Sequence, residues 1–109
     1  MELSDYQSRS RQTAVYPDAG ENLLYPTLGL CGEAGEVAEK VKKLLRDDAG
    51  VLTDARREAL AGELGDVLWY VAQVATEARL DLDEVAAANL AKLRSRQERQ
   101  ALHGSGDTR

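Results

Sequence analysis

The chain has 109 residues, a length that predicts one domain with a single core over residues 1–109. A formal net charge of −5, with 30% charged residues, argues against a nucleic-acid polymer and against a membrane surface as partners. The single cysteine excludes an internal disulfide, and because the sequence has neither a leader pattern nor a long apolar run, we expect a soluble, cytoplasmic protein.

The first helix is predicted near the start of the chain, and we expect four helices and no strand in all. Ser4 is expected to cap this helix, which runs to about Ala14. Pro17 and Gly20 then indicate a turn, because proline and glycine punctuate regular structure.

Two long helices are predicted in the middle of the chain. The second helix is expected over residues 22–46, with Pro26 in its first turn or at a break after a short lead-in. Its apolar stripe recurs at helical spacing: Leu30, Ala34, Val37, Val41 and Leu44. Thr53 is predicted to cap the third helix, which is expected to continue to about Ala78. The stripe of that helix is Leu60, Leu64, Val67, Leu68, Val71, Val74 and Ala75.

A fourth helix is predicted to begin at a cap provided by Asp81 or Asp83 and to run to about Arg99. Residues 101–109 are small and polar, and we expect them to form a flexible tail. Four short, glycine-rich helices leave the broad stripe of the third helix in need of cover. The sequence therefore predicts an all-α, four-helix bundle completed by oligomerisation, as a homodimer or homotetramer.

Two acidic couples are the most informative feature: Glu33 with Glu36, and Glu63 with Asp66. A spacing of three residues places both carboxylates of a couple on one side of a helix, where these acids border the apolar stripe. One such couple is common on a solvated face, but two couples that would converge four carboxylates favour a divalent cation site, with Mg²⁺ as the expected ion and Mn²⁺ as its substitute.

Glycines beside the acids add weight to the prediction of a site. Each costs about 1 kcal/mol relative to alanine inside a helix, so close helix approach or room for a bulky ligand must offset that cost. The glycines concerned are Gly29, Gly32, Gly35, Gly62 and Gly65.

The segments 29–37 and 63–70 resemble the E-x-x-E…E-x-x-D signature of the MazG-like, all-α nucleoside triphosphate pyrophosphohydrolases. The resemblance extends to residues 89–96 and covers most of the chain from about Tyr16 onward. It implies hydrolysis of a (d)NTP to the monophosphate and pyrophosphate, a housecleaning reaction on the nucleotide pool. It also implies that the catalytic and metal-binding residues are Glu33, Glu36, Glu63 and Asp66.

The same resemblance implies the residues that bind the nucleoside triphosphate. The last helix would contribute Asn89, Lys92 and Arg96, and the segment before the metal motif would place Tyr16 and Asn22 near the base.

Three further residues near the acidic couples have two interpretations each. Lys40 and Lys43 continue the flank of the first couple, where they either contact substrate or pair with Glu36 and Glu39. Trp69 is predicted to fall on the other side of its helix from the acids, which favours a place in the core or a subunit interface over a role as a platform for the base.

Two alternative functions remain open at this stage. The first is a phosphoribosyl-ATP pyrophosphohydrolase, against which the aromatic segment from Tyr16 to Tyr25 argues because it suits a base pocket. The second is a non-catalytic helical module that binds metal or nucleotide for regulation. Retention of all four acids argues against that module.

Overall fold

The computed structural model describes residues 1–99 and Gly106, and these residues form four α-helices and no strand. In chain order the elements are α1 (Leu3–Ser10), the 3₁₀ turn η1 (Arg11–Thr13), α2 (Leu24–Asp47), α3 (Asp54–Glu77) and α4 (Leu82–Glu98). The prediction of an all-α fold with four helices is confirmed. The tail predicted at 101–109 lies outside the described residues, apart from Gly106.

Helix starts follow the predicted chemistry in three of the four cases. The hydroxyl of Thr53 accepts a hydrogen bond from the backbone N–H of Arg56 at 3.2 Å, which caps α3. Asp81 caps α4 by accepting from the backbone N–H of Asp83 at 2.8 Å. Pro26 lies in the first turn of α2, where a missing N–H costs no helical hydrogen bond.

The predicted start and end of the first helix are wrong. Glu2 is the N-cap, with the Asp5 carboxylate accepting from its backbone N–H at 3.2 Å, while the Ser4 hydroxyl donates instead to Asp81 at 2.8 Å. The α-helix ends at Ser10, where the chain continues into the 3₁₀ turn η1. Two hydroxyl groups donate to carbonyls at this junction: Ser10 to that of Gln7 and Thr13 to that of Ser10.

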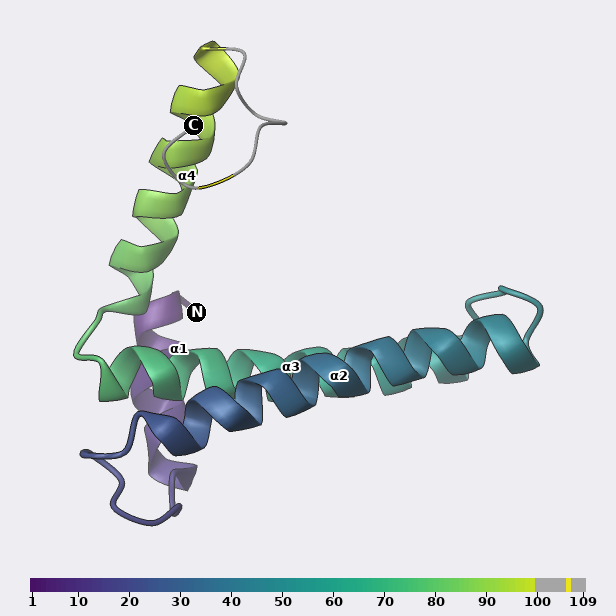
Figure 1. Cartoon of the computed structure of the whole chain (residues 1–109), viewed down its shortest axis with the longest axis horizontal. Helices are drawn as coiled ribbons and strands as arrows, with labels where there is room; N and C mark the ends of the chain where they lie inside the picture. The colour runs from purple at the N-terminus through teal and green to yellow at the C-terminus, as the bar shows by residue number, and fades with distance from the viewer. Residues whose placement is uncertain (100–105, 107–109) are drawn as a thin grey trace.

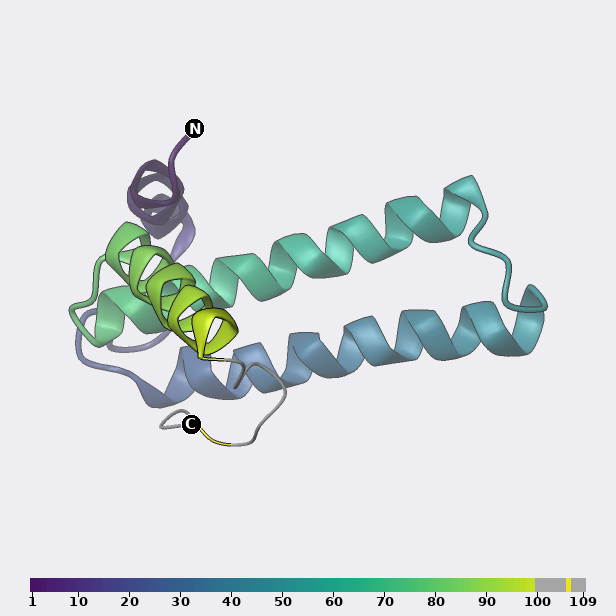
Figure 2. The same cartoon turned by 90° about the horizontal axis from the view of Figure 1, so that it is seen from above.

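The long helices α2 and α3 lie side by side and antiparallel, and a loop over residues 48–53 joins them (Figure 1). Helix α1 packs across α3 at one end of this hairpin, and α4 packs against α1 and leads away from the hairpin, toward the viewer in Figure 2 (Figures 1 and 2). No other helix of the described chain runs along the far half of the hairpin in either view.

The core is small and lies at the end of the hairpin that carries α1 and α4. Ala72 and Ala75 of α3 pack with Leu82 of α4, against Leu3 and Tyr6 of α1. Along the hairpin the predicted stripes are half-buried at Leu30, Val37, Leu44, Leu60 and Val67, and exposed at Val41, Leu64 and Leu68. The stripes therefore mark the seam between α2 and α3, but much of their apolar surface meets solvent in a single chain.

A buried polar network fixes the segment after α1 to α3. Gln73 has no exposed surface, and its amide donates to the Ser10 hydroxyl at 2.9 Å while its carbonyl accepts from Arg11 at 3.2 Å. Glu77 accepts from the backbone N–H groups of Gly20 and Asn22 at 2.7 and 3.2 Å. These bonds hold η1 and the following loop against the hairpin, beside the acidic residues.

None of the helices in the described part of the chain is both long and apolar enough to cross a membrane.

Candidate functional site

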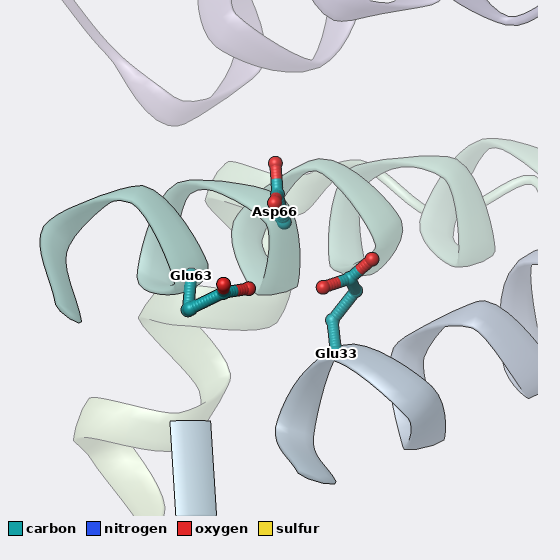
Figure 3. Close-up of side chains that lie close together, drawn as sticks. All are labelled: Glu33, Glu63 and Asp66. Atoms are coloured by element: carbon teal, nitrogen blue, oxygen red, sulfur yellow. The ribbon is translucent and has the colours of Figure 1, made fainter. Parts of the chain in front are cut away.

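Three carboxylates converge across the α2–α3 seam. Glu33 projects from α2 toward Glu63 and Asp66 on α3, and each residue offers an oxygen atom within 4.8 Å of those of the other two (Figure 3). The spacing of three residues puts Glu63 and Asp66 one turn apart on the same side of α3, as predicted. Glu33 and Glu63 are half-buried and Asp66 is exposed, so the cluster is open to a ligand from solvent.

Burial and crowded negative charge both act on Glu33. Partial burial and the neighbouring charges of Asp66 and Glu63, with a further contribution from Glu36, raise the pKa of this carboxyl above its ordinary value. A cation placed among the three oxygens would relieve this repulsion. The cluster is thus arranged for a positive partner.

Glu36 does not join the three converging carboxylates. It is exposed on α2, one turn after Glu33, and acts on Glu33 through its charge. The structure therefore brings together three of the four predicted acids and leaves the fourth beside them.

A pocket of about 330 Å³ opens next to the carboxylates and is lined by Thr13, Glu33, Asp66, Trp69 and Tyr70. The prediction that Trp69 lies away from the acids is wrong. Trp69 follows Asp66 by three residues, which at about 100° per residue turns it only about 60° from Asp66 around the helix. The position of Trp69 near Asp66 could therefore have been predicted from the helical spacing.

The pocket wall is fixed by aromatic packing. The indole Nε1 of Trp69 donates to the Thr13 hydroxyl at 2.8 Å, and its ring meets Tyr70 edge to face with centroids 5.0 Å apart. The Tyr70 ring in turn lies against α2 at Gly29, where a Cβ would overlap ring atoms. Burial is the main cause that raises the pKa of Tyr70, and the neighbouring Tyr25 and Glu33 raise it further.

Thr13 was not predicted as a site residue. No pattern in the sequence indicates it, because η1 reaches the site only through the tertiary fold.

Tyr16 and Asn22, predicted near the base, make contacts within the chain. Tyr16 is buried, stacks on Tyr25 with centroids 4.9 Å apart, and accepts a hydrogen bond from Arg11 at 2.6 Å. Asn22 accepts from the backbone N–H of Tyr25 and donates to the carbonyl of Pro17. Neither side chain lines the pocket, although the Tyr16 ring meets Trp69 edge to face at 6.5 Å.

The predicted substrate-binding residues of the last helix lie on an element that leads away from the hairpin (Figure 1). Asn89 is exposed, Lys92 is half-buried and Arg96 is buried, with one of its nitrogens 3.5 Å from the carbonyl oxygen of Gly106. Within one chain, the structure does not bring these three residues to the carboxylates.

Lys40 contacts the acidic cluster directly. Its Nζ lies 3.6 Å from Oε1 of Glu63, across the seam and away from its own helix. Lys43, by contrast, pairs along α2 with Glu39 at 4.0 Å. Lys40 follows Glu33 by seven residues, close to two full turns, so helical spacing alone places both on one face.

The donor set suits a divalent cation. Carboxylate oxygens are the ligands that Mg²⁺ and Mn²⁺ prefer, and three of them meet here beside an open pocket that leaves room for further oxygen ligands. We infer that Glu33, Glu63 and Asp66 would hold such an ion.

Comparison with known proteins agrees with this geometry. Residues 23–100 match the model of the MazG nucleotide pyrophosphohydrolase domain, a stretch that contains all the acids of the site. The chain belongs to the MazG family. It is 51% identical, over 114 aligned residues that span the whole of both chains, to the "Gene 37 protein" of Mycobacterium phage L5. No solved structure matches the chain.

Proposed function

We propose that this MazG-family chain is a divalent-cation-dependent nucleoside triphosphate pyrophosphohydrolase that converts a (d)NTP to the monophosphate and pyrophosphate. The observation that carries the proposal is the convergence of Glu33, Glu63 and Asp66 beside an aromatic-walled pocket. Family membership supports pyrophosphohydrolase chemistry in general, and the acids provide the ion-binding groups that this chemistry needs.

In the proposed reaction, water attacks the α-phosphorus, the bond from that phosphorus to the α–β bridging oxygen breaks, and pyrophosphate leaves. The cation would neutralise phosphate charge and lower the pKa of the attacking water. Glu33 is our candidate to accept the proton from water, since it lines the pocket and lies among the crowded carboxylates of Glu63 and Asp66.

The pocket between η1 and the hairpin is the proposed nucleoside site. Trp69 and Tyr70 give it an aromatic wall, and contact with an aromatic surface tolerates any base. Its volume of about 330 Å³ lies in the range of small-molecule sites. Tyr16 and Asn22 would support this wall from behind, through the contacts they make within the chain.

We further propose that the active form is a homodimer or homotetramer acting in the cytoplasm, where nucleoside triphosphates are metabolised. Large apolar side chains are exposed along the hairpin: Leu24, Leu28, Val41, Leu45, Leu64 and Leu68. A second copy would cover them. The hairpin of the second copy would also provide a surface for α4, the helix that carries Asn89, Lys92 and Arg96.

The direct test is incubation of the purified protein with each (d)NTP and Mg²⁺, with separate detection of pyrophosphate and orthophosphate. We expect pyrophosphate and the monophosphate in equal amounts from at least one nucleotide, and no reaction in EDTA. Orthophosphate as the first product, or full activity in EDTA, would refute the proposal. Phosphoribosyl-ATP belongs in the same panel, because a strong preference for it would favour the alternative enzyme.

A further inference from the structure

Lys40 is held against the acidic cluster on the side away from the pocket. Its ammonium lies 3.6 Å from Glu63, with 26% of the lysine side chain and 17% of the glutamate side chain exposed. The neighbouring lysines of α2 both contact Glu39 on their own helix, Lys42 at 3.0 Å and Lys43 at 4.0 Å. Lys40 is therefore the lysine of α2 that reaches across the seam to the carboxylates.

The groups of the site follow one another along the hairpin. The pocket wall of Trp69 and Tyr70 comes first, Asp66 lies one turn back along α3, and Glu63 lies one turn further. Lys40 then contacts Glu63. An aromatic surface, a cluster of carboxylates and an ammonium group thus lie in that order.

A nucleoside triphosphate has the matching order of groups: a base, an α-phosphate, and then the β- and γ-phosphates with most of the negative charge. We propose that Lys40 binds oxygens of the β- and γ-phosphates, so that the triphosphate lies along the hairpin with its leaving pyrophosphate at Lys40. This inference rests on the proposed function, because it assumes that the nucleoside occupies the pocket and that the α–β bond is broken.

The local environment suits Lys40 to this task. Lys40 borders the same narrow cleft as Val41, Leu44 and Leu60, so its aliphatic stem has apolar neighbours while the ammonium reaches the carboxylates. Without nucleotide, the ammonium offsets part of the negative charge of the cluster through Glu63. An ammonium has three donors on a flexible stem, so it can exchange a carboxylate oxygen for a phosphate oxygen when nucleotide enters.

The two reaction products separate this inference from simpler roles of Lys40. Binding of inorganic pyrophosphate and of a nucleoside monophosphate is measured by calorimetry with Mn²⁺ present, for the parent and for Lys40→Met, Lys40→Arg and Lys42→Met. We expect Lys40→Met to weaken pyrophosphate binding about tenfold and to leave monophosphate binding within about twofold. Lys40→Arg should retain most of the affinity for pyrophosphate. The matched control Lys42→Met should change neither product.

Binding of Mn²⁺ alone provides a second measurement that does not depend on turnover. Lys40→Met removes a positive charge beside Glu63, so we expect it to bind Mn²⁺ at least as tightly as the parent. Loss of Mn²⁺ binding would show that Lys40 acts by orienting Glu63, and would overturn the phosphate role. Equal weakening of both products, no change in either, or selective loss of the monophosphate would overturn it as well.

Failure of the proposed function gives a different pattern. A parent protein that binds Mn²⁺ and pyrophosphate but hydrolyses no nucleotide would refute the enzyme, while the contrast between the two products would still decide the role of Lys40. Lys40→Gln, which keeps a polar head, replaces Lys40→Met if circular dichroism shows that the methionine variant does not fold.

Discussion

The indole Nε1 of Trp69 donates a hydrogen bond to the Thr13 hydroxyl, 2.8 Å away, and so ties the pocket wall on α3 to the turn after α1. The same hydroxyl donates to the carbonyl of Ser10 at 2.8 Å, so Thr13 is itself held in place. Trp69 is the one tryptophan of the chain. Tryptophan fluorescence of this protein therefore originates at the wall of the proposed nucleoside site.

We predict that a hydrolysed nucleotide, added with Mg²⁺ to the parent protein, changes the intensity or wavelength of Trp69 emission in a saturable way. The physical reason is a change in the polarity and contacts of the indole when the pocket fills. The measurement is a fluorescence titration, with the same nucleotide in EDTA as control. Saturating nucleotide that is turned over without any change in emission would place the nucleoside elsewhere.

Asp66→Asn is predicted to abolish turnover and to leave the metal-free protein as stable as the parent or more so. The substitution removes a charged ligand and also one of three carboxylates that repel each other within 4.8 Å. Mg²⁺ should raise the melting temperature of the parent, because a ligand of the folded state stabilises it, and should do so less for the variant.

Thermal melts of both proteins in EDTA and in Mg²⁺ test this prediction. A variant clearly less stable than the parent in EDTA, with an unchanged response to Mg²⁺, would remove Asp66 from the metal site. Glu58→Gln is the control, because Glu58 is an exposed acid on the same helix.

Gly29→Ala is predicted to lower stability, whereas Gly35→Ala should leave it unchanged or raise it. Both glycines are interior to α2, where alanine favours the helix by about 1 kcal/mol. A Cβ at Gly29 would overlap the Tyr70 ring, but a Cβ at Gly35 would meet no atom within 4 Å. Urea unfolding of the two variants gives the comparison. Equal stabilisation by both changes would contradict the close packing of Tyr70 on α2.

Local patterns predicted the helices, two of their caps and the pairing of Glu63 with Asp66 on one side of α3, because each depends on spacing within one helix. The approach of Glu33 from α2 depends also on the packing of the two helices. The sequence left open whether the glycines of the two long helices allow close packing or leave open space. The structure gives close packing at Gly29, against the Tyr70 ring. It gives open space at the other four, which are Gly32, Gly35, Gly62 and Gly65. Contacts between distant segments were out of reach: Thr13 with Trp69, and Lys40 with Glu63. Their positions depend on how η1 and the hairpin pack, which no local spacing encodes.

The protein is predicted to be at least a dimer at micromolar concentration. Among the described residues the buried apolar side chains are Tyr16, Pro26, Ala72, Ala75 and Leu82, while Leu28 and Leu90 are more than 60% exposed. Burial of such side chains stabilises by about 1.5–3 kcal/mol each, which favours association. Size-exclusion chromatography with light scattering measures the mass. A monodisperse monomer would refute this prediction.

Glu77→Gln is predicted to destabilise the protein at neutral pH by about 1.5–3 kcal/mol, the range for hydrogen bonds to a charged group. The Glu77 side chain is 1% exposed and lies 3.4 Å from Arg11. Burial by itself would raise the pKa of Glu77, but the backbone N–H groups of Gly20 and Asn22, together with Arg11, outweigh it and hold the pKa below its ordinary value. Glutamine keeps the shape and loses the charge.

The pH dependence of that loss distinguishes an ionised Glu77 from a neutral one. A carboxyl with a depressed pKa in the folded state contributes its stability above its unfolded pKa, about 4.3 for glutamate, and loses it as the pH falls through the lower folded value. The difference in unfolding free energy between parent and Glu77→Gln should therefore be constant from about pH 6 to pH 8, and should shrink toward pH 3. Urea unfolding at each pH measures it, with Glu58→Gln as the exposed control on the same helix. A difference that stays constant down to pH 3, or grows, would mean that Glu77 is not held ionised by the loop and Arg11. The anchor of the segment that carries Tyr16 and Asn22 would then depend on packing alone.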